Sequence, residues 1–238
     1  MNNSSIIQIK AVIWKETKEF FRSAKLYAIF TIIFVVVIQI MSSNQIIGND
    51  KLTIGIKQVL LGYSIIYLSL MSIPFFGCTL LSRIIYEERC DNAIHVLLAT
   101  GVDAKIIWFG KMITTYIISY LVFICSVIVY YISIYILFDF KLVLSAKIIS
   151  LAFLVMPILA FGVMSLMGYI YWALKNPQII GMLFPMLFVM AVWNLAMKLS
   201  EELPTSNIIL GSMAVGAVLI ISSAFLVGLI SKQRITNV

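Results

Sequence analysis

The chain has 238 residues, of which 62% are hydrophobic and only 11% are charged. A soluble domain of this length has too little interior to bury that much apolar surface, so most of it must face lipid. The net charge of +7 does not predict nucleic-acid binding, because the basic residues are spread among hydrophobic blocks and form no continuous stripe. The cysteines, at positions 78, 90 and 125, are widely spaced and include no CxxC pair, which argues against a disulfide framework or a zinc site.

The first 25 residues predict a basic amphipathic helix. At the helical period, apolar and charged side chains gather on opposite faces, with Lys10 as the one intruder on the apolar face. The apolar face holds Ile6, Ile9, Ile13, Phe20 and Ala24, and the charged face holds Lys15, Lys18, Glu19 and Arg22. The segment lacks the apolar core and cleavage site of a secretory signal. Such a helix is expected to lie in the inner membrane surface, either as a plain anchor or as a contact for a partner.

Six hydrophobic stretches are long enough to cross about 30 Å of hydrocarbon. They cover roughly 26–41, 58–82, 112–138, 148–174, 178–197 and 208–230. They lack the short alternation of barrel strands, and a backbone in lipid must satisfy its own hydrogen bonds, so each is predicted to be a helix. With the N-terminus in the cytoplasm, twelve of the 17 Lys and Arg residues lie in inside segments, which favours cytoplasmic termini. The expected fold is an all-α integral membrane protein with a single transmembrane domain over 1–238.

The catalytic inventory is short. The sequence has one histidine, His95, and no HExxH, GxSxG or P-loop motif, so we expect no catalytic residue, no metal site and no nucleotide site in this chain. The six predicted spans also contain no Asp, Glu, Lys, Arg or His. Carriers coupled to protons or ions normally keep such groups at membrane depth. A self-powered secondary transporter is therefore disfavoured.

The polar segment 83–111 joins the second and third spans and is predicted to be cytoplasmic. Asn92 is a favourable N-cap for a short helix over 93–99, and Gly101 ends that helix because glycine adopts the left-handed C-cap conformation easily. A second helix over 104–110 then leads into the third span. The segment is thus predicted to be a short helix, a tight turn and a re-entry helix.

One face of the short helix is apolar, because Ile94, Leu97 and Leu98 follow i, i+3, i+4 spacing. Charged side chains precede it at Glu87, Glu88 and Arg89. Apolar side chains that fill a groove, with charges that fix orientation, are typical of a docking surface. The same face can instead pack on its own bundle or on the lipid surface, and the residues alone leave both open.

The segment resembles the cytoplasmic loop between spans 2 and 3 of type-2 ABC transporter permeases. That loop reads approximately E-R-E-x-G-T-x-E-x-L-L-x-x-P, followed by a glycine-lysine before span 3. The residues that match are Glu88, Arg89, Leu97, Leu98, Ala99, Thr100, Gly110 and Lys111. The chain departs from the family at three places, where it has Asn92-Ala93 for Gly-Thr, His95 for a glutamate and Gly101 for proline.

The resemblance implies an elbow helix before span 1 and a coupling helix that inserts into a separate ATP-hydrolysing subunit. The implied coupling residues are Glu87, Glu88, Arg89, Asn92, Ile94, His95, Leu97, Leu98, Thr100 and Gly101. The implied elbow residues are Ile9, Ile13, Phe20 and Arg22. ATP and Mg would then bind to two copies of a P-loop ATPase, and this chain would pair with a second permease copy or a close relative.

The expected function is the membrane subunit of an ATP-driven exporter in the cell membrane, with the faces of spans 2 and 5 lining the route by family inference. An uncharged, aromatic-rich interior suits an amphipathic or hydrophobic cargo such as a peptide, a lipid or a drug-like molecule. The alternative is a membrane scaffold or immunity factor that docks a cytoplasmic partner without transport. A membrane enzyme would need a clustered polar site, for which Glu201 and Glu202 near Lys198 are the best candidates.

Overall fold

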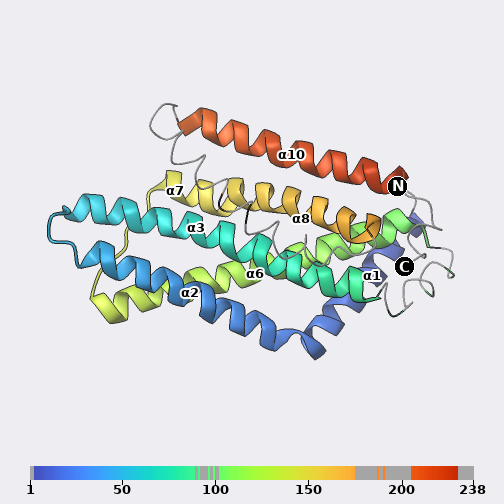
Figure 1. The fold of residues 1–238 in the computed structure, drawn as a ribbon, viewed down its shortest axis with the longest axis horizontal. Coiled ribbons are helices and arrows are strands. Elements are labelled where there is room, and N and C mark those ends of the chain that lie inside the picture. Colours follow the sequence, from blue (N-terminus) through green and yellow to red (C-terminus); the bar gives the residue numbers. More distant parts are fainter. Residues whose placement is uncertain are drawn as a thin grey trace.

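The fold is taken from a computed structural model that describes residues 3–88, 91, 96, 99, 102–174, 187, 190 and 205–229. All regular structure in these residues is helical, without a strand. The elements are α1 (Asn3–Ser23), α2 (Lys25–Ile47), α3 (Ile54–Leu81), η1 (Ser82–Glu87), α6 (Ala104–Phe138), α7 (Ala146–Ser150), η2 (Leu151–Val155), α8 (Met156–Ala173) and α10 (Thr205–Leu229). The long helices run side by side in an elongated bundle (Figure 1). The all-α prediction is confirmed for this part of the chain.

Among the described residues, four helices are long and apolar enough to cross a membrane: Lys25–Ile47, Ile54–Ile85, Ala104–Phe138 and Ala146–Ala173. They contain the first three predicted spans and all but the last residue of the fourth, and each is longer than predicted. The predicted span 178–197 lies outside the described residues except for Leu187 and Met190. The predicted span 208–230 coincides with α10, whose stretch Met213–Val227 is a shorter apolar helix.

The third membrane-crossing helix differs most from its prediction. The sequence suggested a re-entry helix over 104–110 and then a span from 112, but α6 runs unbroken from Ala104 to Phe138. At 1.5 Å per residue, 35 residues extend over about 52 Å, well beyond about 30 Å of hydrocarbon. One end of α6 must therefore stand outside the membrane interior, and the charged side chains of its first turns occupy that end.

Helix α3 lies at the centre of the bundle, packed between α2, α6 and α8. Its inward residues are almost completely buried, and Ile65, Ile73 and Phe76 are each 0% exposed. Outward side chains are equally apolar, as Phe30 on α2 and Ile136 on α6 illustrate. Helices that are apolar on every side belong in a lipid environment rather than in water.

Helices α8 and α10 approach closely at two facing glycines. A Cβ added to Gly162 would lie 2.7 Å from the backbone oxygen of Gly216, and one added to Gly216 would lie 3.1 Å from the oxygen of Ile158. The absence of side chains on the two glycines allows this close approach. In lipid, where the hydrophobic effect does not drive helices together, the dispersion contacts made by such close packing stabilise the helix pair. α10 is thereby fixed against the described bundle.

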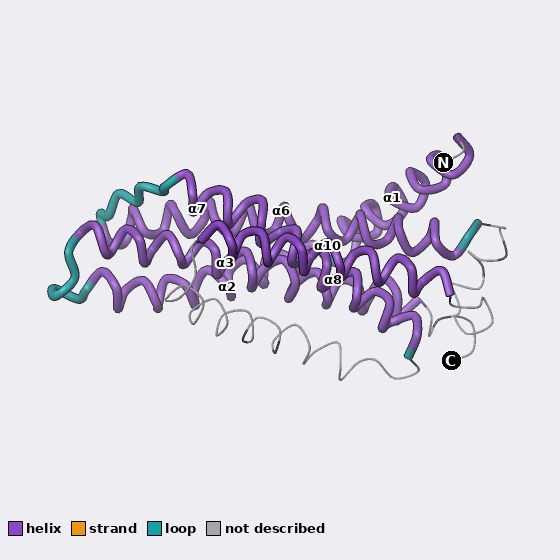
Figure 2. Tube along the Cα trace, turned by 90° about the horizontal axis from the view of Figure 1, so that it is seen from above, coloured by secondary structure: helices purple, strands orange, loops and turns teal. Residues whose placement is uncertain are grey.

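The two ends of the bundle differ. The α2–α3 and α6–α7 connections share one end, and α1 lies at the other end with the last turn of α3 and the first turn of α6 (Figure 1). Near the first end, the Tyr130 hydroxyl lies 2.8 Å from Ser43 Oγ and joins α6 to α2. At the second end, α1 leaves the bundle at an angle (Figure 2). Glu16, Glu88 and Lys111 form ion pairs at this second end.

Candidate functional site

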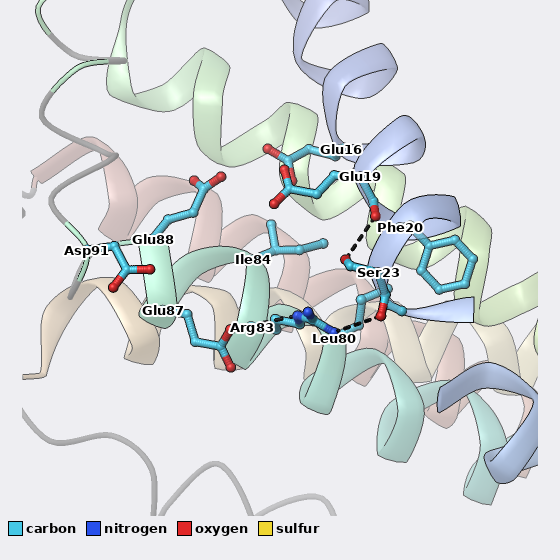
Figure 3. Close-up of a pocket in the computed structure, with 11 residues that line it drawn as sticks. Glu16, Glu19, Phe20, Ser23, Leu80, Arg83, Ile84, Glu87, Glu88 and Asp91 are labelled. Atoms are coloured by element: carbon cyan, nitrogen blue, oxygen red, sulfur yellow. Dashed lines mark hydrogen bonds and ion pairs between the residues drawn. The ribbon is translucent and has the colours of Figure 1, made fainter. Parts of the chain in front are cut away.

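The candidate site is a cluster of ion pairs where α1, η1 and α6 meet. Glu16 comes from α1, Glu88 follows η1, and Lys111 lies in the second turn of α6. Lys15 approaches the same carboxylates from the surface of α1. In Figure 3 the carboxylates of Glu16 and Glu88 reach toward each other from their separate helices. Three elements far apart in sequence are thus joined by charge.

Lys111 is the buried centre of this cluster, with its side chain 0% exposed. Its Nζ donates to Glu16 Oε1 at 2.7 Å and to Glu88 Oε2 at 2.6 Å. A third bond, of 3.1 Å, goes to the backbone oxygen of Ile84. An ammonium has three donors, so each of them has an acceptor. A buried charge held in this way is stable only while its partners remain in place.

Lys15 contacts the same carboxylates from the outer side. Its Nζ donates to Glu88 Oε1 at 2.5 Å and lies 3.5 Å from Glu16 Oε1 and 3.9 Å from Glu19 Oε2. The carboxylates of Glu16, Glu19 and Glu88 have oxygens within 4.8 Å of one another, a spacing that could hold a metal ion. The Lys15 and Lys111 ammonium groups already occupy the positions between these oxygens, so the arrangement fits ion pairing better than direct metal coordination.

The charges perturb each other as expected. Burial alone would raise the pKa of the Glu88 carboxyl, but the charge of Lys111 and the bonds from Lys111 and Lys15 lower it below its usual value. Burial alone would lower the pKa of Lys15, but its hydrogen bond to Glu88 and the nearby carboxylates raise it. Both groups are therefore held in their charged forms at neutral pH.

The backbone at this corner is a π-helix. Residues Ser82–Glu87 form η1 directly after the regular turns of α3. A π-helical turn is wider than an α-helical one, and such segments occur frequently at functional sites. The carbonyl of Ile84 inside η1 accepts the third bond of Lys111. The π segment therefore contributes a backbone acceptor as well as the chain direction that brings Glu88 to α6.

A pocket of about 240 Å³ lies beside the ion pairs, between α1 and η1 (Figure 3). It is lined by Glu16, Glu19, Phe20, Ser23, Ala24, Leu80, Arg83, Ile84, Glu87, Glu88 and Asp91. Arg83 crosses it, with Nε 3.7 Å from Glu87 Oε2 and Nη1 3.4 Å from the Ser23 oxygen. Glu16 Oε2 is buried and has no hydrogen-bond partner among the described residues. The lining is strongly acidic.

The structure places the predicted coupling residues unevenly. Glu87 is exposed at the pocket rim, whereas Glu88 has a side chain only 13% exposed and faces inward. Glu88 therefore serves the internal cluster rather than standing free as a docking charge. The remaining predicted coupling residues, Arg89, Asn92, Ile94, His95, Leu97, Leu98, Thr100 and Gly101, lie outside the described residues.

The predicted apolar face of α1 is shifted in the structure. Phe20 is buried against α3, where its ring centroid lies 6.3 Å from that of Phe76, while Ile9 and Ile13 are half-buried and Arg22 is exposed. Ile6 is 41% exposed. The stripe that α1 buries is Val12, Glu16 and Phe20, and the buried Ala24 directly after the helix continues it. The four-residue spacing of this stripe is visible in the sequence, but the polar Glu16 in its middle concealed it.

Two members of the cluster were missed from the sequence. Glu16 was not singled out, and Lys111 was interpreted as a flank of the third span. The expectation that the spans lack ionisable groups holds for the predicted limits, but α6 begins earlier and buries Lys111. A glutamate between apolar residues at i−4 and i+4 was the available signal, because buried carboxylates require a charged or hydrogen-bonding partner.

Comparisons with known proteins give no match. No family model matches the chain, and neither a curated protein nor a solved structure matches it.

Proposed function

We propose that this chain is the membrane subunit of an ATP-driven exporter of the type-2 ABC class. It forms the translocation pathway with a second copy or a close relative, and two separate P-loop ATPase subunits bind ATP and Mg. The chain has six spans in the cell membrane, α1 as the elbow helix, and both termini in the cytoplasm. It carries no ATPase site of its own, and its cargo is an amphipathic or hydrophobic peptide, lipid or drug-like molecule.

The observation that carries this proposal is the closure of the polar segment at its base. Glu88 stands at the start of segment 89–110 and Lys111 follows its end, and their side chains meet at 2.6 Å. Glu16 of α1 binds the same ammonium at 2.7 Å. The two ends of the connection between η1 and α6 are therefore held together, and this base is attached to α1 as well.

Such a base is suited to transmit force. The ion pairs are buried, and separating a buried pair leaves an uncompensated charge, which costs several kcal/mol. A partner that moves the loop therefore moves the three helices together instead of opening the base. The bundle has a means to receive motion at this end, while the sequence shows no P-loop of its own.

Co-purification tests the proposal. The full chain, expressed with the P-loop ATPases of the same cell and reconstituted in proteoliposomes, is expected to bind an ATPase and to move a hydrophobic substrate only with ATP. Leu97→Asp with Leu98→Asp is expected to abolish ATPase binding, because two carboxylates would enter an apolar groove. Val143→Asp, at an exposed residue of the opposite end, is the matched control and retains binding.

Two results contradict the proposal in different ways. If no P-loop ATPase co-purifies, or if the leucine variant binds as tightly as the native chain, the coupling role is wrong. If an ATPase or another partner binds but no nucleotide-dependent substrate movement occurs, the chain is a docking scaffold or immunity factor.

A further inference from the structure

The pocket between α1 and η1 has an excess of negative charge that its own cations do not balance. Five carboxylates line it, from Glu16, Glu19, Glu87, Glu88 and Asp91. Three cations among the described residues contact them, Arg83 inside the pocket and Lys15 and Lys111 behind Glu16 and Glu88, so two negative charges remain in excess. The whole chain carries a net charge of +7, so an acidic hollow is contrary to its overall balance. An acidic hollow in a basic protein attracts a cationic group.

The neighbouring lysines are already committed. The three donors of Lys111 go to Glu16 Oε1, Glu88 Oε2 and the backbone of Ile84. Lys15 Nζ donates to Glu88 Oε1 and to Glu16 Oε1 and lies 3.9 Å from Glu19 Oε2. Neither lysine lines the pocket. Among the described side chains that line the pocket, only Arg83 remains as a cationic donor, and it already pairs with Glu87.

The Glu16 carboxylate has one oxygen that lacks a donor among the described residues. The Glu16 side chain is 1% exposed, and its Oε2 has no hydrogen-bond partner in the described part of the chain. A buried acceptor without a donor costs about 1–3 kcal/mol, and more when it is charged. Because Glu16 lines the pocket, a donor that enters the pocket lies next to this carboxylate.

The size and geometry of the pocket select the donor. A volume of about 240 Å³ is too large for a bare metal ion and has room for a larger cationic group. The carboxylates of Glu16 and Glu19 approach from α1, while Glu87 and Asp91 lie on the opposite side (Figure 3). A guanidinium is planar and has five N–H donors in a fixed fork, so it can bind carboxylates on two sides at once.

The geometry points to an arginine side chain of a cytoplasmic protein partner as the occupant of this pocket. The identity of that partner as the ATPase subunit rests on the function proposed above. The capacity to bind a guanidinium belongs to this chain alone and is tested without any partner.

The test uses Nα-acetyl-arginine N-methylamide as the probe and the purified full chain in lipid nanodiscs. Saturation-transfer NMR is expected to show saturable binding that about 0.5 M NaCl weakens. The norleucine analogue, which lacks the guanidinium, is expected not to bind. In Glu19→Gln with Glu87→Gln the affinity is expected to fall about tenfold, since two charge-assisted bonds are lost. Both side chains are more than half exposed, so the variant keeps the buried ion pairs.

Asp103→Asn is the matched control, because Asp103 is an exposed acid at the start of α6, near the same end of the bundle, and does not line the pocket. Asparagine is an equally good N-cap, so this variant is expected to bind the probe like the native chain. Absence of saturable binding, equal binding of the norleucine analogue, or unchanged affinity in the double variant overturns the proposal. Stoichiometric Mn²⁺ binding that displaces the probe also overturns it in favour of a metal site.

The two proposals fail separately. If the probe binds as described but no ATPase co-purifies, the pocket stands and the exporter function falls. If an ATPase co-purifies but the probe does not bind, or if the glutamine variant holds the ATPase as tightly as the native chain at every salt concentration, the function stands and the pocket assignment falls.

Discussion

Replacing Lys111 by methionine removes the charge at the centre of the ion-pair cluster and keeps much of the side-chain volume. The change leaves Glu16, with a side chain 1% exposed, and Glu88, at 13%, without their shared ammonium. Glu88 keeps Lys15 at 2.5 Å, whereas Glu16 keeps it only at 3.5 Å. The cost is therefore concentrated on Glu16, and we expect about 3 kcal/mol, the lower end of the range for a broken buried pair.

A second substitution makes the reasoning quantitative. Glu16→Gln alone removes one carboxylate and leaves Lys111 bound to Glu88 and the Ile84 oxygen. In the double variant, Glu16→Gln with Lys111→Met, no unpaired charge remains at Glu16. The double variant is expected to lose at least about 1 kcal/mol less than the sum of the two single variants, because contacting charges couple by 0.5–3 kcal/mol.

The assay is reversible unfolding in mixed detergent micelles, combined with hydrogen exchange of the amides of α1. Lys105→Met, at an exposed position of the same helix, is the control and is expected to change stability by less than about 0.5 kcal/mol. If the two single effects add within about 0.5 kcal/mol, or if Lys111→Met is as stable as the control, the buried charge cluster does not hold α1 to α6.

Three further changes test other parts of the structure. Gly162→Ala is expected to destabilise the protein by about 1–3 kcal/mol, because the new Cβ would clash with the backbone of α10. Gly55→Ala is the control, since its new Cβ meets nothing within 4 Å. Thermal unfolding compares the two variants. Since the pKa of Glu88 is lowered in the fold, its contribution is present above about pH 4.3, the unfolded value, and is lost as pH falls through the lowered value. The protection factors of the α1 amides, corrected for the intrinsic exchange rate at each pH, are therefore expected to fall on acidification, and this acid response should be smaller in Glu88→Gln. Tyr130→Phe removes a buried hydroxyl that contacts α2 and is expected to cost about 0.6–1.7 kcal/mol by unfolding, against nearly nothing for the exposed Tyr135→Phe.

Hydropathy predicted the fold class and the first four membrane-crossing helices because lipid imposes a length and a composition on each of them. The limits were less accurate, since a helix continues past the membrane wherever its backbone and side chains allow. α2 includes the polar stretch 42–45, and α6 includes the polar turn around Lys105. Hydropathy predicts the limits of the segment that faces lipid, whereas the limits of the helix depend on where its backbone hydrogen bonds stop.

The site was predictable only in part. The unusual charge density of segment 83–111 correctly drew attention to Glu88 and to the end of the bundle where Lys111 lies. The sequence could not show that Glu16 pairs with Lys111, because 95 positions separate them and no local period relates α1 to α6. Charge pairing across helices is a property of tertiary packing, and a single sequence does not record it.

The order of the ion-pair residues along the chain has a consequence for biosynthesis. Glu16 and Glu88 both precede Lys111, so both counter-charges exist before the ribosome adds the lysine. A lone ammonium is costly to place inside a membrane bundle. Because its partners are synthesised first, Lys111 can form its ion pairs with Glu16 and Glu88 as soon as α6 docks on the preceding helices. A circular permutation that moved α1 to the C-terminus would leave Lys111 waiting for Glu16 and should slow or misdirect the integration of α6.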